Sequence, residues 1–350
     1  MKIDIFDTHF FEAQNVQDEV DVVIEIIMKE IINTKKMKNK KIFFKPNLTF
    51  QTPKEGVTTN FKIIKAISKF CLENDIAHYY GESDAGAYAW TTKKSYEEHG
   101  YKNLEKEFGI EFIHLSEQEW ENINFETDKG KELSIDVVKN FNNIADCTIS
   151  LPVIKTHAMT GISLGIKNLW GCVPNPMRMI YHQNINDYLP FLTKYYNLIS
   201  TIYDGTISLT GNGPMYGTSI FSNTIGYSMS PIKGDFITSK LMNIDPKSIG
   251  HLVKTFNNYD YDINEYDKKI EMEFRKNNIS KPWGDYAPSK TGLNYIEWVT
   301  FKSKFISKVV FTSKLSPMIY KLFNVLKPKD QRNNSPKNNF DNDKRQISKL

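Results

Sequence analysis

The sequence predicts an α/β protein with a largely parallel sheet, helices on both faces of that sheet and a basic helical C-terminal extension. Two observations support this prediction. Short apolar runs typical of buried strands alternate with longer segments whose apolar residues recur every three or four positions, as they do in amphipathic helices. Such alternation favours parallel strands joined by right-handed helical crossovers, so that both faces of the sheet are covered.

Each predicted element has its own signal. The first helix, at 16–33, places valine or isoleucine at helical spacing with acidic residues between them. The first strand ends at Lys45-Pro46-Asn47, because proline cannot continue a central ladder. The short apolar runs lie at 41–44, 76–80, 111–115, 147–151, 198–203 and 225–230, and the helical patterns at 16–33, 61–71, 93–108 and 235–242.

Charge divides the chain into a body and a basic end. The 350 residues carry a net charge of +4, but residues 298–350 hold twelve basic and three acidic side chains, so the rest is mildly acidic. An acidic body argues against nucleic-acid binding, which needs a basic surface. We expect an α/β body at 1–297, a basic amphipathic helical segment at 298–330 and a disordered tail at 331–350. The helices at 298–327 either pack on the body or lie in an anionic membrane interface.

Several protein classes are excluded at this stage. No apolar run approaches the roughly 18 residues that a membrane-spanning helix needs, and the N-terminus does not resemble a signal peptide, so we expect a cytoplasmic protein. Cys71, Cys147 and Cys172 lie far apart and form no CxxC pair. We therefore expect no iron–sulfur cluster bound within this chain.

Polar residues follow the predicted strands at the points where they end. Lys45 and Asn47, Glu82 and Asp84, Lys155 and His157, and Asp204 all lie within a few residues of a strand end. Because the carboxyl ends of parallel strands share one edge of a sheet, and ligands bind there, we expect a single site at that edge.

The stretch from Lys155 to His182 contains the residues best suited to chemistry. Lys155 and Lys167 supply two ammonium groups, and His157 and His182 supply two imidazoles. Ammonium groups bind carboxylates and phosphates, and imidazoles exchange protons near neutral pH. The alternative interpretation is that these are solvated lysines and incidental histidines.

Two other kinds of site are poorly supported. The glycines around Gly213 do not match a dinucleotide-binding loop, since Pro214 intervenes and Gly217 lies four residues later, and a special backbone turn fits better. The His, Cys and Asp residues of this region have no diagnostic metal-ligand spacing. We expect no metal site made by the protein alone, while a divalent cation held jointly with a substrate phosphate stays an alternative.

A set of short motifs occurs in one order along residues 41–250. They are Lys45-Pro46-Asn47-Leu48, the segment 151–157, the segment 167–172, His182, Asp204-Gly205, Gly213-Pro214 with Gly217, and Asp235. Together they resemble the bacterial and archaeal family catalogued as domain of unknown function 362. The resemblance implies an α/β fold and marks as the site Lys45, Lys155, His157, Lys167, Asn168, His182, Asp204 and Asp235.

The chain departs from that family in two respects. Many relatives append a ferredoxin-like domain with iron–sulfur cysteines, which this sequence lacks. Relatives also tend to carry two aspartates around the last motif, and Ser230 stands where the first would be.

We therefore expect an enzyme of small-molecule metabolism that acts on an anionic substrate, a carboxylate or a phosphate. His157 and His182 would exchange protons, and Asp204 would orient a histidine or bind a cation. The expected substrate-binding residues are Lys45, Asn47, Lys155, Lys167, Asn168, Gly213 and Asp235. The alternatives are a non-catalytic anion-binding or scaffold protein and a redox accessory protein that accepts a metal cluster from a partner.

Overall fold

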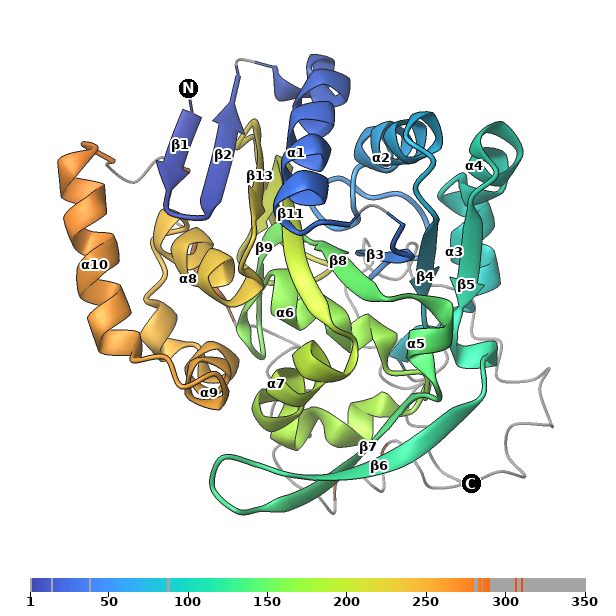
Figure 1. Cartoon of the computed structure of the whole chain (residues 1–350). Helices are drawn as coiled ribbons and strands as arrows, with labels where there is room; N and C mark the ends of the chain where they lie inside the picture. The colour runs from blue at the N-terminus through green and yellow to red at the C-terminus, as the bar shows by residue number, and fades with distance from the viewer. Residues whose placement is uncertain are drawn as a thin grey trace.

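The computed structural model describes residues 2–279 except 14, 38, 87 and 88, together with 283, 284, 286–289, 306 and 310. Within these residues the chain forms an eleven-stranded sheet (Figure 1). Its strands are β1 (Lys2–Ile5), β2 (Thr8–Glu12), β3 (Ile42–Pro46), β4 (His78–Glu82), β5 (Glu111–His114), β8 (Cys147–Leu151), β9 (Val153–His157), β10 (Gly161–Ser163), β11 (Leu198–Thr210), β12 (Thr218–Ile220) and β13 (Thr224–Ser228).

The sheet has a parallel centre and an antiparallel flank. Its main path runs β1-β2-β13-β11-β8-β3-β4-β5, and the five strands from β11 to β5 pair in parallel. The strands β13, β2 and β1 extend the sheet by antiparallel pairing. The predicted α/β class is confirmed, and its parallel part is the part that carries the predicted strand ends.

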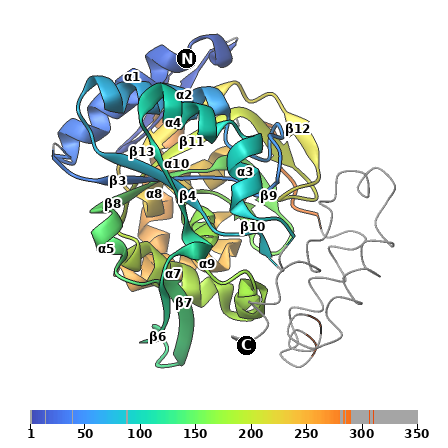
Figure 2. The same cartoon turned by 90° about the vertical axis from the view of Figure 1, so that its right-hand side faces the viewer.

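Helices cover both faces of the sheet, as expected. One buried apolar cluster contains residues of α1 (Val20–Thr34), α2 (Phe61–Glu73) and α4 (Tyr101–Phe108), with α3 (Thr92–Glu98) packed against it. The cluster on the other face contains residues of α5 (Phe141–Ile144), α6 (Gly165–Asn168), α7 (Ile185–Tyr195), α8 (Pro231–Leu241), α9 (Gly250–Asn258) and α10 (Ile263–Lys276). Figure 2 shows α1, α2 and α4 above the strands and α5, α7 and α9 below them.

Strand register brings three strand ends to one edge. Lys45 of β3 is paired with Ser150 of β8, and Pro46 with Leu151. On the other side, β3 pairs with β4 through Phe44 and Tyr80, which places Glu82 level with Pro46. The carboxyl ends of β3, β4 and β8 therefore lie side by side, as the sequence predicts.

The strand predicted at 198–203 does not stop at Asp204 as expected. The strand β11 continues to Thr210, with Asp204 paired to Val153 of β9 in its middle. The carboxylate of Asp204 is satisfied locally by Thr206 and by the backbone N–H of Asn60, so it does not interrupt the ladder. Asp204 is consequently a mid-strand residue.

One predicted helix is divided in the structure. The helix predicted at 93–108 is two helices, α3 and α4, because Gly100 takes a left-handed conformation with φ of 81° between them. Between β5 and β8 the chain also forms a two-stranded hairpin, β6 (Trp120–Glu126) and β7 (Glu132–Val138), which extends along the lower side of the molecule in Figure 1.

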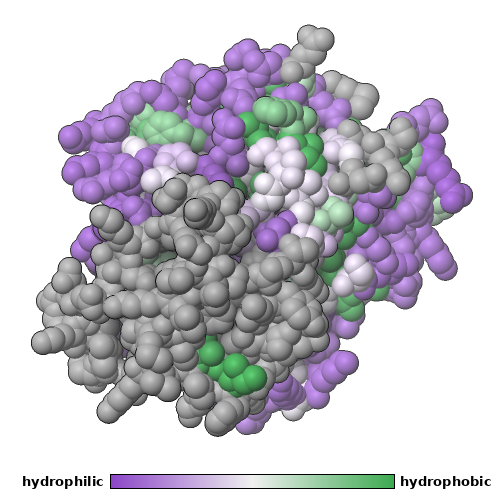
Figure 3. Space-filling view, turned by 180° about the vertical axis from the view of Figure 1, so that it is seen from behind, coloured by the Kyte–Doolittle hydropathy of each residue, from purple (hydrophilic) through white to green (hydrophobic). Residues whose placement is uncertain are grey.

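The predicted segments at 298–330 and 331–350 lie outside the described residues, apart from 306 and 310. Among the helices that the structure describes, none is long and apolar enough to cross a bilayer. In the view of Figure 3, hydrophilic residues make up most of the described outer rim, and hydrophobic residues gather nearer the middle.

Candidate functional site

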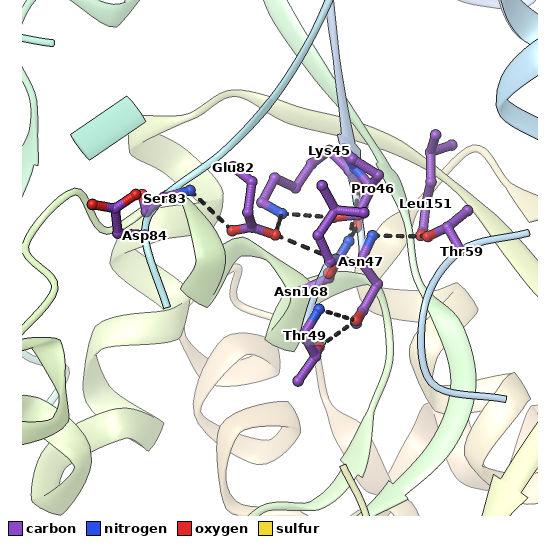
Figure 4. A network of polar contacts seen from close by, with 12 residues as sticks. Lys45, Pro46, Asn47, Thr49, Thr59, Glu82, Ser83, Asp84, Leu151 and Asn168 are labelled. Carbon is purple, nitrogen blue, oxygen red and sulfur yellow. Dashed lines mark hydrogen bonds and ion pairs between the residues drawn. The ribbon is translucent and has the colours of Figure 1, made fainter. Parts of the chain in front are cut away.

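A buried ion pair joins the ends of two neighbouring strands. The Lys45 ammonium at the end of β3 lies 2.6 Å from Glu82 Oε2 at the end of β4, and it also donates to the Pro46 carbonyl at 2.6 Å (Figure 4). The other Glu82 oxygen accepts from the Ser83 N–H at 3.1 Å. Gly171 packs so closely that an added Cβ would lie 2.1 Å from Glu82 Oε1. The pair is therefore buried against the backbone of Pro46, Ser83 and Gly171.

The second lysine of the edge, Lys155 on β9, has only neutral hydrogen-bond partners among the described residues. Its ammonium donates to the Val57 carbonyl at 2.6 Å, to Asn47 Oδ1 at 3.1 Å and to Thr49 Oγ1 at 3.4 Å. Burial, reinforced by the charge of Lys167, lowers the pKa of Lys155 well below its ordinary value. Lys155 thus fixes the loop after β3 against β9.

A carboxylate fixes the start of the short helix α6. Asp235 on α8 accepts from the N–H groups of Gly165 and Ile166, both at 2.9 Å, and from the Tyr203 hydroxyl at 2.8 Å. These N–H groups have no acceptor inside the helix, so Asp235 satisfies them. Burial raises the pKa of Asp235 to about 7, and the hydrogen bonds that it accepts oppose this rise. Asp235 therefore positions Lys167, the third residue of α6, and its two oxygens are already in use.

Lys167 is the central group of the site. Its side chain is buried, with 7% of the residue exposed, and its ammonium lies 5.9 Å from the centre of the Trp170 ring. Within the described part of the chain it forms no ion pair or hydrogen bond to an oxygen. Burial, together with the positive charges of Arg178 and Lys45 and against the charge of Glu82, lowers its pKa to about 7.

Two further residues complete the polar core of the site. Asn168 donates to the Lys45 carbonyl at 2.8 Å and so ties α6 to β3. Arg178, in the 3₁₀ turn Arg178–Asn184, is buried and donates to the Asp84 carbonyl at 2.6 Å. Of the buried cations Lys45, Lys155, Lys167 and Arg178, only Lys45 has a carboxylate at ion-pair distance among the described residues. The site therefore holds more positive charge than its own carboxylates pair.

Three buried histidines surround Lys167. Burial and the charge of Lys167 lower the pKa of His157 well below its ordinary value. The same two causes lower the pKa of His182 to about 3 and that of His251 to about 3. All three imidazoles are therefore neutral near pH 7, and each can donate from one ring nitrogen and accept at the other.

The surroundings of the three imidazoles differ. His157 Nδ1 accepts from the Met159 N–H at 3.1 Å, which leaves Nε2 as the donor. The ring of His182 packs edge-on against Trp170, with 5.0 Å between the ring centres. His251 on α9 is completely buried, and neither of its ring nitrogens has a hydrogen-bond partner among the described residues. The Trp170 indole N–H also lacks one.

Asp204 and Gly213 hold the backbone segments around the site in place. Asp204 accepts from Asn60 N at 2.7 Å and from Thr206 Oγ1 at 2.7 Å, and burial raises its pKa, which the charge of Lys155 opposes. No histidine is among its hydrogen-bond partners in the described chain. Gly213 lies so close to β9 that an added Cβ would be 1.9 Å from the Thr156 carbonyl oxygen. Both residues hold neighbouring segments in place.

The structure thus gathers most of the predicted site residues around Lys167. Contacts or electrostatic effects link the set Lys45, Asn47, Lys155, His157, Lys167, Asn168 and His182. The charge of Asp204 acts on Lys155, and Asp235 accepts a hydrogen bond from the backbone of α6. Their roles toward a ligand stay predictions. In the described residues no three His, Cys, Asp or Glu side chains are grouped so as to hold a metal ion.

The family model described as domain of unknown function (DUF362) matches residues 42–240, more than half of the chain. The chain belongs to this family. The DUF362 match includes the strands from β3 to β13, α6 and the 3₁₀ turn that carries Arg178, and it ends before His251.

Two known proteins are similar to this DUF362 member over part of its length. A thylakoid-associated protein of Synechocystis sp. is 27% identical over 217 residues, which are 60% of this chain and 65% of the relative. The chain therefore spans less than two thirds of that relative. A crystal structure of a Thermotoga maritima protein matches with a TM-score of 0.34 and 14% identity, covering 57% of this chain and 52% of the other.

Sequence reasoning missed Arg178, Trp170 and His251. Arg178 had a usable signal, because it is the sole arginine among the first 274 residues of a chain that otherwise uses lysine there. Arginine is selected over lysine where planar, bidentate recognition of a carboxylate or phosphate matters. His251 had no such signal, since it lies in an ordinary helical pattern far from any predicted strand end.

Proposed function

We propose that this protein is an enzyme of small-molecule metabolism that binds an anionic substrate, a carboxylate or a phosphate, at Lys167 and Arg178. Lys45, held by Glu82, adds a third positive charge at the edge of the sheet. Lys155, Asn47 and Asn168 hold the surrounding loops.

The observation that carries this proposal is the surplus of buried cations. An unpaired buried charge is costly, so proteins pair such charges or neutralise them. Arg178 cannot be deprotonated in a protein, and among the described residues its guanidinium donates to a backbone carbonyl, that of Asp84. A substrate anion would supply the missing negative charge to Arg178 and Lys167. The unsatisfied indole N–H of Trp170 offers one more donor to such an anion.

The histidines supply the chemistry once the anion is bound. A substrate anion beside them would favour the imidazolium form and raise their low pKa values toward the working pH. A histidine in that range can accept a proton from one atom and return it to another, which contributes on the order of 10²–10⁴ in rate. We assign proton transfer to His157 and His182, whose environments are set by Lys167 and Trp170. We place this enzyme in the cytoplasm, and peripheral membrane contact through residues 298–327 remains our alternative for its location.

The most direct test of ligand class is mass spectrometry of the intact chain as isolated, under non-denaturing conditions. A co-purifying carboxylate or phosphate compound should appear with the wild type and be lost from Lys167→Met, which keeps the side-chain length and removes the charge. Lys102→Met, at an exposed lysine, is the matched control and should keep the ligand. Recovery of a cationic ligand, or equal recovery from Lys167→Met, would contradict the proposal.

A second test separates an enzyme from a scaffold. With the identified ligand, His157→Gln and His182→Gln should lose at least about a hundredfold in turnover while binding the ligand with nearly unchanged affinity. A wild-type protein that binds the ligand and converts none of it would favour the non-catalytic anion-binding protein.

A further inference from the structure

A cavity with a volume of about 560 Å³ lies beside the turn that follows β9. It is formed by the turn between β9 and β10, the segment that leads into α9, and residues near 286. Its lining consists of Ala158, Met159, Thr160, Gly161, Asn186, Asn243, Ile244, Ser248, Ile249, Gly250, Tyr286 and Pro288. This size falls within the range of small-molecule sites.

The lining is uncharged and partly polar. Asn186, Asn243 and Ser248 offer amide and hydroxyl groups, and Tyr286 offers a phenol, while Ala158 and its apolar neighbours complete the wall. Groups of this kind hydrogen-bond to hydroxyls and amides of a ligand and do not favour a charge. The cavity is therefore suited to a neutral, hydrogen-bonding group.

The two chain segments that line the cavity also carry two histidines of the site. Ala158 directly follows His157, and Gly250 directly precedes His251. The charge of Lys167 lowers the pKa of both histidines. The cavity lining is therefore adjacent along the chain to two histidines that respond to the charge of Lys167.

A buried histidine directly follows the cavity lining along the chain. His251 is completely buried, and both of its ring nitrogens lack a partner among the described residues. The residue before α9, Ile249, provides no side-chain cap for the first N–H groups of the helix. Asn186 lies against Gly250, where an added Cβ would be 2.5 Å from its amide nitrogen. A ligand with several oxygens would supply hydrogen-bond partners to His251 and to Asn186.

We infer that this cavity holds the hydroxylated, uncharged part of the substrate, whose anionic end lies at Lys167 and Arg178, with His251 hydrogen-bonded to the substrate between them. The substrate class is then a phosphate or carboxylate attached to a polyhydroxylated carbon chain, such as a sugar phosphate or a sugar acid. This inference rests on the proposed function.

The test compares matched pairs of probes by isothermal titration calorimetry. Inorganic phosphate is paired with ribose 5-phosphate, and acetate with gluconate, so each pair shares an anion and differs in hydroxyl groups. The variants are Ser248→Phe, which fills the mouth of the cavity, and Asn186→Leu, which removes an amide at constant size. Ser219→Phe, at an exposed residue of β12, is the matched control. Circular dichroism melting of each variant checks that it folds.

In at least one pair, the hydroxylated probe should bind the wild type about tenfold or more tightly than the bare anion, as two added hydrogen bonds would produce. Ser248→Phe and Asn186→Leu should reduce that ratio toward one and leave the affinity for the bare anion unchanged. Ser219→Phe should keep the wild-type ratio.

Failure of the cavity and failure of the anion site have different signatures. Equal affinities within both pairs for the wild type, or an unchanged ratio in both cavity variants, would overturn the inference while leaving the anion site intact. Absence of binding by all four probes would overturn both, and binding that Lys167→Met does not weaken would reject the anion site.

Discussion

Lys45 and Glu82 form an ion pair across the ends of two adjacent parallel strands, with 2.6 Å between Nζ and Oε2, and the pair is almost completely buried. Glu82 pairs with Lys45 alone, and Lys155, Lys167 and Arg178 have no carboxylate at ion-pair distance in the described chain. The arrangement leaves the remaining positive charge for a ligand.

Glu82→Gln should strongly destabilise the fold. Removing one member of a buried pair leaves the other charge uncompensated, which costs about 3–5 kcal/mol. The control is Glu107→Gln, which breaks the exposed pair with Lys65, 2.8 Å apart, and should cost less than about 1 kcal/mol. Urea titration gives the free energy of unfolding of each variant. Equal losses of unfolding free energy in the two variants would show that the buried pair stabilises the fold no more than an exposed pair does.

Asp235→Asn should loosen α6 and weaken anion binding indirectly. An asparagine amide turns donor groups toward the N–H groups of Gly165 and Ile166, so the unfolding free energy should fall by about 1–3 kcal/mol. The affinity for inorganic phosphate should fall with it, since Lys167 loses its support. Asp262→Asn, at the N-cap of α10, is the control, because asparagine caps a helix as well as aspartate does. Unchanged stability and affinity in Asp235→Asn would reject this positioning role.

The parts of the site that the sequence predicts are those fixed by strand register. The shared location of Lys45, Glu82 and Lys155 can be predicted because each lies where an apolar run ends, and neighbouring parallel strands end at a common edge. The position of Lys167 depends on Asp235, nearly seventy residues later, and no local pattern encodes that contact.

Non-local contacts also explain what the sequence did not reveal about Asp204 and His251. Aspartate followed by glycine usually ends a strand. The Asp204 carboxylate instead accepts hydrogen bonds from Asn60, the residue before α2, and from Thr206, so β11 continues through it. His251 is brought to Lys167 by the packing of α9, a tertiary contact that periodicity does not specify.

His251→Phe should reduce the acid sensitivity of the fold. The pKa of His251 is about 3 in the folded protein, below its ordinary value of 6.5, so the unfolded chain takes up a proton first as the pH falls. The stability is present above pH 6.5 and is lost toward pH 3, and this one group accounts for about 2 kcal/mol between pH 6.5 and 5. Urea titrations at pH 7.5 and 5 measure the loss. An identical loss in wild type and variant would mean that His251 does not titrate in this way.

The central claim is that Lys167 in its protonated form binds the anion, and the pH dependence of sulfate binding tests it most directly. Sulfate keeps a constant charge between pH 6 and 9, so any change in its affinity comes from the protein. Because burial lowers the pKa of Lys167 to about 7, the ammonium is present below that pH and is lost above it. Calorimetry should show sulfate affinity falling by about tenfold per pH unit as the pH rises above the pKa of Lys167 in the unliganded protein, about 7. Lys167→Met should bind sulfate weakly and with no such dependence, and Lys102→Met should follow the wild type. A wild-type affinity that is constant across this range, or a Lys167→Met profile identical to that of the wild type, would contradict the account.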